Sequence, residues 1–234
     1  MPLVAARYTL SGVVTAVDAE FGGQTLDRQP EAVKQVAMAD RLVLTKVDRA
    51  APQEAAALTS RLHAMNPSAR LVRSVMGDAD PGNLFDTGLH RAGAVAERVS
   101  GWMGGTWRVQ GSQTGPHDVR IRTVTWFAEE PLAWDAVETA LETLLEVRGE
   151  RILRLKGLVN LAGEPGPRAV HAVQHCLYPS ARLPRWPDAD RRTRLVFVTR
   201  DLEDATIALT LDSFLGPAAR ARSGSHAAPT PIPR

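Results

Sequence analysis

The chain has 234 residues, of which 44% are hydrophobic and 23% charged, and these values are typical of a globular protein. They exclude the collagen-like, prion-like and wholly disordered classes. The single cysteine, Cys176, can form neither an internal disulfide nor a multi-cysteine metal site. The chain start lacks the apolar core of a signal peptide, and no run approaches the ~18 apolar residues of a membrane span. We therefore expect a cytoplasmic protein with no membrane partner.

The formal net charge of +2 is weak support for nucleic-acid binding. The 25 arginines and three lysines are spread along the sequence rather than clustered. Residues 213–234 carry three arginines and no acid, so the rest of the chain has a charge of −1 (2 minus 3). Nucleic-acid surfaces normally show clustered basic residues, and we expect no nucleic-acid partner here.

The first hundred residues alternate between strand and helix patterns. Aliphatic, β-branched runs at 10–17, 41–45 and 70–75 predict buried parallel strands. Between them the sequence predicts one helix capped by Asp27 and a second helix that begins at Pro52 and ends at Asn66. Such alternation is typical of a parallel α/β sheet with right-handed crossovers, so we predict an α/β domain over residues 1–100.

The second half follows a different pattern. The glycine-rich segment 101–116 shows no apolar periodicity and predicts a linker. A smaller α+β domain is predicted over residues 117–215, and a disordered Ala/Pro/Ser/Arg-rich tail over 216–234. The expected elements of that domain are a strand at 117–127, a helix from Pro131, strands at 152–161, 169–178 and 194–199, and a closing helix capped by Asp201.

The clearest chemical signal is the tetrapeptide Thr45-Lys46-Val47-Asp48, which follows a predicted buried strand. Ligands of open parallel sheets bind beyond the carboxyl ends of the strands. The Asp48 carboxylate can accept hydrogen bonds from both the ring N–H and the exocyclic amine of guanine, and the Lys46 stem can lie along the base. The N-K-x-D element of GTPases works in this way, with Thr45 in place of its Asn. A surface turn without a ligand is the alternative.

Three further features were weighed as sites. No Gly-Lys pair occurs anywhere in the sequence, which excludes a G-x-x-x-x-G-K-[ST] phosphate loop within these residues. His171 and His175 have a zinc-like spacing, but their flanks alternate like a strand, on which the two rings would stand roughly 13 Å apart. Asp18, at the end of a predicted strand, could meet magnesium, but a helix cap is the favoured interpretation.

Several segments, taken together, resemble the CobW family of P-loop GTPases, metallochaperone-like proteins of cobalamin synthesis and zinc homeostasis. The resemblance implies GTP binding, with Thr45, Lys46 and Asp48 at the guanine base and Ser74 and Val75 in the loop that closes over it. It also implies a metalloprotein client that meets the family's C-terminal domain. The matching segments are 12–19, 25–48, 66–69, 155–161 and 173–198, in the order of the family.

The sequence also departs from the family pattern. The family's Walker A loop, its G-C-x-C-C metal motif and its Walker B-like segment have no counterpart in these residues. We therefore expect no Mg or Zn ligands here, and GTP binding only when an upstream polypeptide complements the chain. The expected function is that of a fragment of a CobW-like zinc or cobalt chaperone that alone does not hydrolyse GTP. The alternative is a non-enzymatic protein-interaction module.

Overall fold

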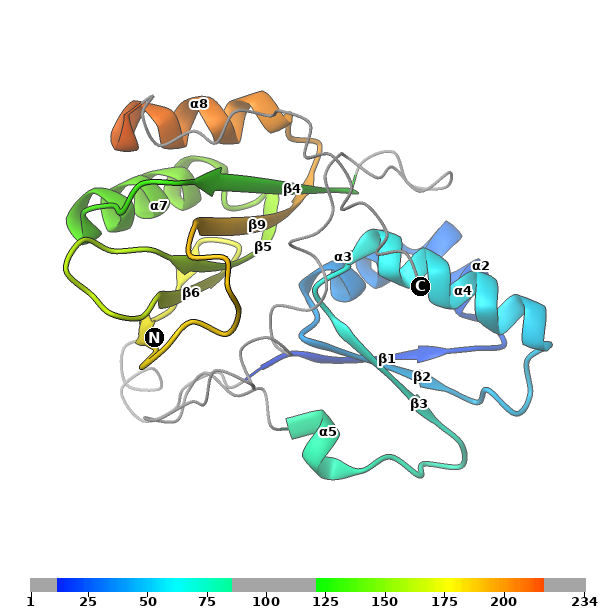
Figure 1. Cartoon of the computed structure of the whole chain (residues 1–234). Coiled ribbons are helices and arrows are strands. Elements are labelled where there is room, and N and C mark those ends of the chain that lie inside the picture. The colour runs from blue at the N-terminus through cyan, green and yellow to red at the C-terminus, as the bar shows by residue number, and fades with distance from the viewer. Residues whose placement is uncertain (1–11, 86–120, 217–234) are drawn as a thin grey trace, which may run out of the picture.

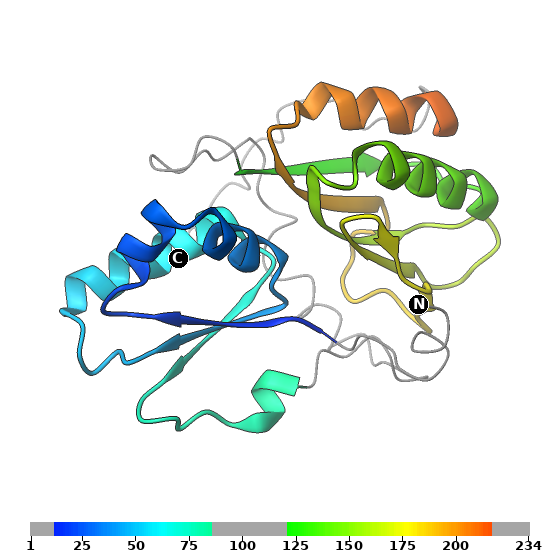
Figure 2. The same ribbon diagram turned by 180° about the vertical axis from the view of Figure 1, so that it is seen from behind.

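The computed structural model describes residues 12–85 and 121–216, which form two sheets with their helices (Figures 1 and 2). The predicted linker at 101–116 and residues 217–234 of the predicted tail lie outside the described residues. Within the described part of the chain, every helix is too short or too polar to cross a bilayer.

The first sheet is parallel, with its three strands in the order β1-β2-β3. This confirms the predicted parallel α/β arrangement. Helices α2, α3 and α4 lie over one face of the sheet, and α5 lies beyond the other (Figure 1). The elements are β1 (Val14–Asp18), α2 (Gly22–Arg28), α3 (Pro30–Met38), β2 (Arg41–Thr45), α4 (Pro52–Met65), β3 (Arg70–Ser74) and α5 (Pro81–Phe85).

Prolines set the beginnings of α3 and α4. Pro30 and Pro52 occupy the first turn, where a missing N–H costs nothing and a fixed φ suits the helix. The expectation that Asp27 caps a helix was wrong. Asp27 lies inside α2 and pairs with Arg61 at 2.8 Å, and Gln29 holds the N-cap of α3 in an extended conformation. The residue before a proline disfavours the helical region, so a separate short helix ends there.

The second sheet is antiparallel, in the order β4-β9-β5-β6-β7, with β8 paired to β6. This separate antiparallel domain confirms the predicted change from α/β to α+β. Its elements are β4 (Ile121–Ala128), α7 (Trp134–Arg148), β5 (Ile152–Val159), β6 (Arg168–Val173), β7 (Cys176–Leu177), β8 (Ala181–Arg182), β9 (Thr193–Arg200) and α8 (Asp204–Leu215).

Three local expectations for this domain were wrong. The predicted strand 169–178 is divided into β6 and β7 by a turn in which Gln174 has a φ of 50°. Helix α7 begins at Trp134 rather than Pro131, because Leu132 forms a bridge with Leu161. Helix α8 has Glu203 at its N-cap, and Asp201 lies before it with a φ of 51°.

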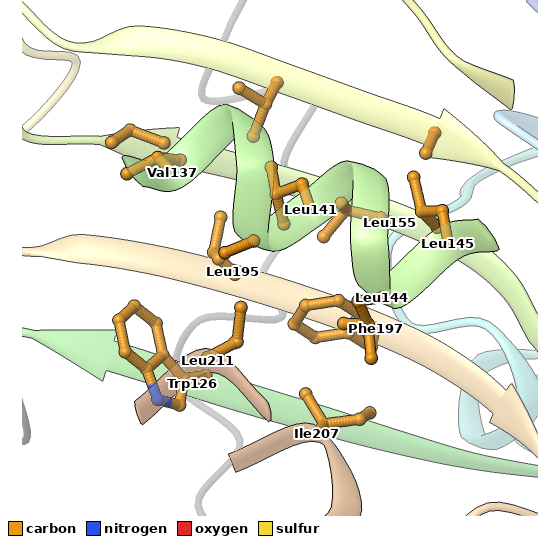
Figure 3. Close-up of a cluster of buried hydrophobic side chains, with 14 of the residues drawn as sticks. Trp126, Val137, Leu141, Leu144, Leu145, Leu155, Leu195, Phe197, Ile207 and Leu211 are labelled. Carbon is orange, nitrogen blue, oxygen red and sulfur yellow. The ribbon is translucent and has the colours of Figure 1, made fainter. Parts of the chain in front are cut away.

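The core of the second domain lies between its sheet and the helices α7 and α8 (Figure 3). Leu141 and Leu144 of α7 face Leu155 and Phe197 of the sheet, and Leu211 of α8 closes the cluster. All five side chains are at most 1% exposed. Removal of these apolar side chains from water stabilises the domain.

The opposite face of the second sheet packs against the first domain. Ile121, Leu153 and Val198 join the same buried cluster as Val36 of α3 and Leu62 of α4. Leu153 and Leu62 are fully buried, so the two domains share a continuous apolar core. Sequence periodicity within each domain did not reveal this shared core.

A buried ionic cluster lies at the same interface. Asp40, directly before β2, accepts hydrogen bonds from Arg154 Nη2 and from Lys156 Nζ, the latter at 3.1 Å. The Asp40, Arg154 and Lys156 side chains are 3%, 3% and 1% exposed. Arg154 Nη1 also donates to the Met38 carbonyl at 3.2 Å, at the end of α3, where cations complement the helix dipole. The cluster fixes the amino end of β2 against β5 of the second domain.

Candidate functional site

The carboxyl ends of the three parallel strands form one edge of the first sheet. Asp18, Thr45 and Ser74 are the last residues of their strands and are paired in register, Asp18 with Thr45 and Thr45 with Ser74. The backbone continues the pairing beyond the strands, because Ala19 N donates to Thr45 O at 2.9 Å. Open parallel sheets bind ligands at this edge.

The turn after β2 presents Lys46 and Asp48 to solvent. Thr45 Oγ1 donates to the Val17 carbonyl at 3.3 Å, which holds the end of β2 against β1. Lys46 has a φ of 55°, a left-handed conformation that is uncommon for a residue with a side chain, and its carbonyl accepts from Arg49 N at 3.0 Å. Asp48 is exposed and makes no hydrogen bond or ion pair with the residues that the structure describes. Its carboxylate therefore keeps its acceptor capacity for a ligand.

Lys46 is held from the neighbouring strand. Its Nζ lies 2.6 Å from Oδ2 of Asp18, while Oδ1 of Asp18 accepts from the backbone N–H groups of Glu20 and Phe21 at 2.8 and 3.3 Å. Partial burial raises the pKa of the Asp18 carboxyl, but the hydrogen bonds from Lys46 and from the two backbone amides outweigh it. The pKa of Asp18 therefore lies below its usual 3.8.

The segment after β3 forms a tight, projecting turn. Ser74 is buried at the end of the strand, and Val75 forms a bridge with Asp78, whose N–H donates to the Val75 carbonyl at 2.8 Å. The two central residues, Met76 and Gly77, have φ values of 52° and 83°, as in a type I′ turn. Val75 and Met76 are 41% and 93% exposed, so apolar side chains project beside the end of β2.

These positions define what the edge can bind. Register pairing brings Thr45 and Ser74 next to each other, and the turns that carry Asp48 and Val75 follow directly. An exposed, unpaired carboxylate suits a planar ligand with two adjacent N–H donors, and a lysine stem and apolar side chains suit its faces. Lys46 is the one predicted site residue with a side-chain partner at this edge, and sequence analysis did not foresee that Asp18 holds it.

The histidine pair is not a metal site in this structure. His171 is buried on β6 and stacks on Tyr178 with ring centroids 4.8 Å apart, whereas His175 lies in the turn between β6 and β7. Asp18, the other residue weighed for a metal, is paired with Lys46. The expectation that Asp18 caps a helix was wrong, because Phe21 holds the N-cap of α2 and no side chain caps it. Across residues 12–85 and 121–216, no three His, Cys, Asp or Glu side chains come together as a possible metal centre. The residues described here therefore do not fit a zinc or magnesium site.

Both domains match a known family. Residues 2–73 match the CobW/HypB/UreG nucleotide-binding domain, and residues 121–215 match the C-terminal domain of the cobalamin synthesis protein CobW. The chain is 29% identical over 201 residues to the zinc chaperone YjiA of Escherichia coli (strain K12), covering 86% of this chain and 60% of YjiA.

Solved structures give the same result. The structure resembles the crystal structure of the Zn(II)-bound YjiA GTPase from E. coli, with a TM-score of 0.65 and 25% identity, over 92% of this chain and 64% of that one. A Zn(II)-bound triple mutant of the same GTPase matches with the same TM-score and identity, over 91% of this chain and 64% of its own. The chain thus spans less than two thirds of the length of these relatives.

Proposed function

Because this chain belongs to the CobW family, we propose that its first domain binds the guanine base of GTP or GDP through the turn Thr45–Asp48. In this proposal Asp48 accepts hydrogen bonds from the two guanine donors, Lys46 lies along one face of the base, and the loop at Ser74 and Val75 closes over it. The protein then works within a GTP-dependent zinc or cobalt chaperone, and its client is a metalloprotein.

One observation carries the base-binding proposal. Asp48 is exposed at the carboxyl end of β2 and makes no contact that would occupy its carboxylate in the described part of the chain. The carboxylate of a structural aspartate in a turn normally accepts hydrogen bonds from nearby backbone N–H groups, as that of Asp18 does at the end of β1. Asp48 does not, which favours a ligand over a merely structural role.

The proposal separates base recognition from phosphate and metal chemistry. The printed sequence contains no Gly-Lys pair, and phosphoryl transfer relies on loop amides, a lysine and Mg²⁺ around the phosphates. In our proposal, residues that are not among these 234 make the phosphate and Mg²⁺ contacts, either in a longer chain or in a complementing polypeptide. Support for zinc as the metal comes from the zinc chaperone to which the chain is similar.

The test uses nucleoside monophosphates, because the proposed base contacts all lie within this chain, whereas GTP itself also needs the phosphate contacts of the complementing residues. We expect NMR titration of the ¹⁵N-labelled chain to show tighter binding of GMP than of AMP. Asp48→Asn should weaken GMP binding by about 2–4 kcal/mol, or at least about thirtyfold, since an amide places its NH₂ against a guanine donor. Xanthine carries an oxygen where guanine has its amine, so the variant should gain relative preference for XMP.

A matched control removes an equal charge nearby. Asp78→Asn alters an exposed aspartate in the turn after β3 and should leave the ratio of GMP to XMP affinity unchanged. An unchanged ratio in Asp48→Asn, or equal effects of the two variants, would show that the turn does not read the base.

A second candidate function is a protein-interaction module. The second domain has its own apolar cluster between α7, α8 and the antiparallel sheet, so this function would need a folded second domain and no bound nucleotide. Wild-type protein that binds GMP and AMP equally weakly, yet retains this folded domain, would favour the module over the nucleotide-binding function.

A further inference from the structure

At the carboxyl edge of the first sheet, the two carboxylate oxygens of Asp18 accept hydrogen bonds from two different segments. Oδ1 accepts from the N–H groups of Glu20 and Phe21, which lead into α2. Oδ2 accepts from Nζ of Lys46 at 2.6 Å. A residue that served only the chain entering α2 would need one oxygen, so the second contact needs its own explanation.

The ion pair contributes little to folding. The Lys46 and Asp18 side chains are 49% and 26% exposed, and exposed ion pairs stabilise a protein by about 0–1 kcal/mol. Its geometric effect is larger. Two backbone amides fix the direction of the Asp18 carboxylate, so the point at which Lys46 Nζ is held is also fixed.

The backbone of Lys46 supports the same conclusion. Its φ of 55° costs conformational energy for a residue with a side chain, and such residues are concentrated at ligand sites. The backbone sets where the Lys46 stem begins, and Asp18 sets where it ends. Because Asp18 pairs in register with Thr45, the stem spans from the turn after β2 back to the end of β1.

We propose that Asp18 is a positioning residue that holds the Lys46 side chain in the orientation in which its stem lies against the bound base. This inference rests on the proposed guanine site. It assigns Asp18 neither to a metal nor to the base itself, and its effect on affinity passes entirely through Lys46.

Asp18→Asn separates this role from that of the turn that precedes α2. Asparagine accepts the backbone hydrogen bonds of such a turn as aspartate does, so the variant keeps the acceptor for Glu20 and Phe21 and loses the charge that holds Lys46. We expect GMP affinity to fall at least about fivefold, with a thermal midpoint within about 4 °C of wild type, since an exposed pair is worth less than about 1 kcal/mol. Removing a negative charge would by itself favour an anionic ligand, so the expected loss opposes the bulk charge effect.

Glu20→Gln is the matched control. Glu20 pairs with Arg49 at 3.0 Å on the same edge, and the Glu20 side chain is as exposed as that of Asp18, at 26%. This variant should change GMP affinity less than twofold. In a Lys46→Met background, Asp18→Asn should have no further effect, because residues that act through one another are not additive.

Each outcome of these titrations is decisive. Equal GMP affinities for Asp18→Asn and Glu20→Gln, in a wild type that prefers GMP to AMP, overturn the positioning role and leave the proposed function standing. An undiminished effect of Asp18→Asn in the Lys46→Met background also overturns it. A wild type without any preference for GMP refutes the proposed function itself, and the positioning role falls with it.

Discussion

The buried ionic cluster between the domains allows a quantitative test of how strongly they are coupled. Asp40 is the acidic member of the cluster and faces two cations, Arg154 and Lys156, all at most 3% exposed. Asp40→Asn leaves both cations buried beside a neutral amide. Removal of one partner from a buried ion pair typically destabilises a protein by about 3–5 kcal/mol. For a chain of this size, that corresponds to a fall in Tm of about 6–20 °C.

For Lys156→Met, by contrast, we expect almost no change in the free energy of unfolding. The substitution removes one of the two cations that pair with Asp40 and leaves Arg154 paired with it, so the Asp40 carboxylate keeps a charged partner. Burial lowers the pKa of Lys156 to about 8 even though Asp40 opposes the shift, so the charged form is disfavoured at this position. Replacement of a buried charge by an apolar side chain of similar length is often neutral or stabilising. We therefore expect a change within about 1 kcal/mol of zero.

The position of the tryptophans makes the assay specific. All five occur at residue 102 or later, and Trp126 and Trp134 belong to the second domain, whereas Asp40 belongs to the first. Urea unfolding followed by tryptophan fluorescence should show a lower midpoint for Asp40→Asn. Asp27→Asn, which breaks the partly exposed pair with Arg61, should lower the free energy of unfolding by less than about 1 kcal/mol. A fluorescence midpoint unaffected by Asp40→Asn, or damage from Lys156→Met as large as from Asp40→Asn, would refute the coupling.

Two further predictions concern the same interface and sheet. An unfolded lysine keeps its proton to about pH 10.5 whereas buried Lys156 loses it near 8, so the unfolded chain binds more protons between these values. Between these pH values, the free energy of unfolding of the wild type should therefore rise relative to that of Lys156→Met. Chemical denaturation at several pH values measures this difference, and parallel pH profiles of the two proteins would contradict it. Gly157→Ala should destabilise by about 1–3 kcal/mol, because a Cβ there would lie 2.4 Å from Leu195 Cδ2 and 2.8 Å from the Arg194 carbonyl. Gly23→Ala in α2, with open space around its Cβ, should cost nothing and can gain up to about 1 kcal/mol, and equal denaturation midpoints for the two glycine variants would be inconsistent with this packing.

Elements with strong local chemistry were predictable from the sequence. Strand β2 and the start of α4 lie where the aliphatic run 41–45 and Pro52 predicted, because these signals act within a few residues. The turn at Gln174 was not predictable, because strand-like alternation continues through it. The prediction for Asp27 was wrong because local sequence again did not show where one element ends. Asp27 is a residue type that often caps helices, but it lies inside the short helix α2, just before α3.

Contacts between distant segments were beyond sequence analysis. Arg154 and Asp40 are 114 residues apart, and nothing in the periodicity of either segment pairs them. In β5, Arg154 and Lys156 alternate with apolar residues and have the pattern of a solvated strand face, yet another domain covers that face. The proximity of Asp18 and Lys46 could have been predicted from the sequence. Both residues follow directly from predicted parallel strands, and the carboxyl ends of such strands share one edge.

The two polar clusters occupy opposite ends of one strand, which keeps their experimental consequences separate. Asp40 precedes β2 and the Thr45–Asp48 turn begins at its last residue, so five residue steps, or about 16 Å of extended chain, separate Asp40 from Thr45. Substitutions that far apart, without shared partners, act additively on stability. Asp40→Asn should therefore lower the unfolding midpoint without altering the preference for GMP over AMP in the folded protein. Asp48→Asn should alter that preference without lowering the midpoint. A loss of base preference in the Asp48 variant then reports the chemistry of one carboxylate, since the fold that presents it is held at the other end of the strand.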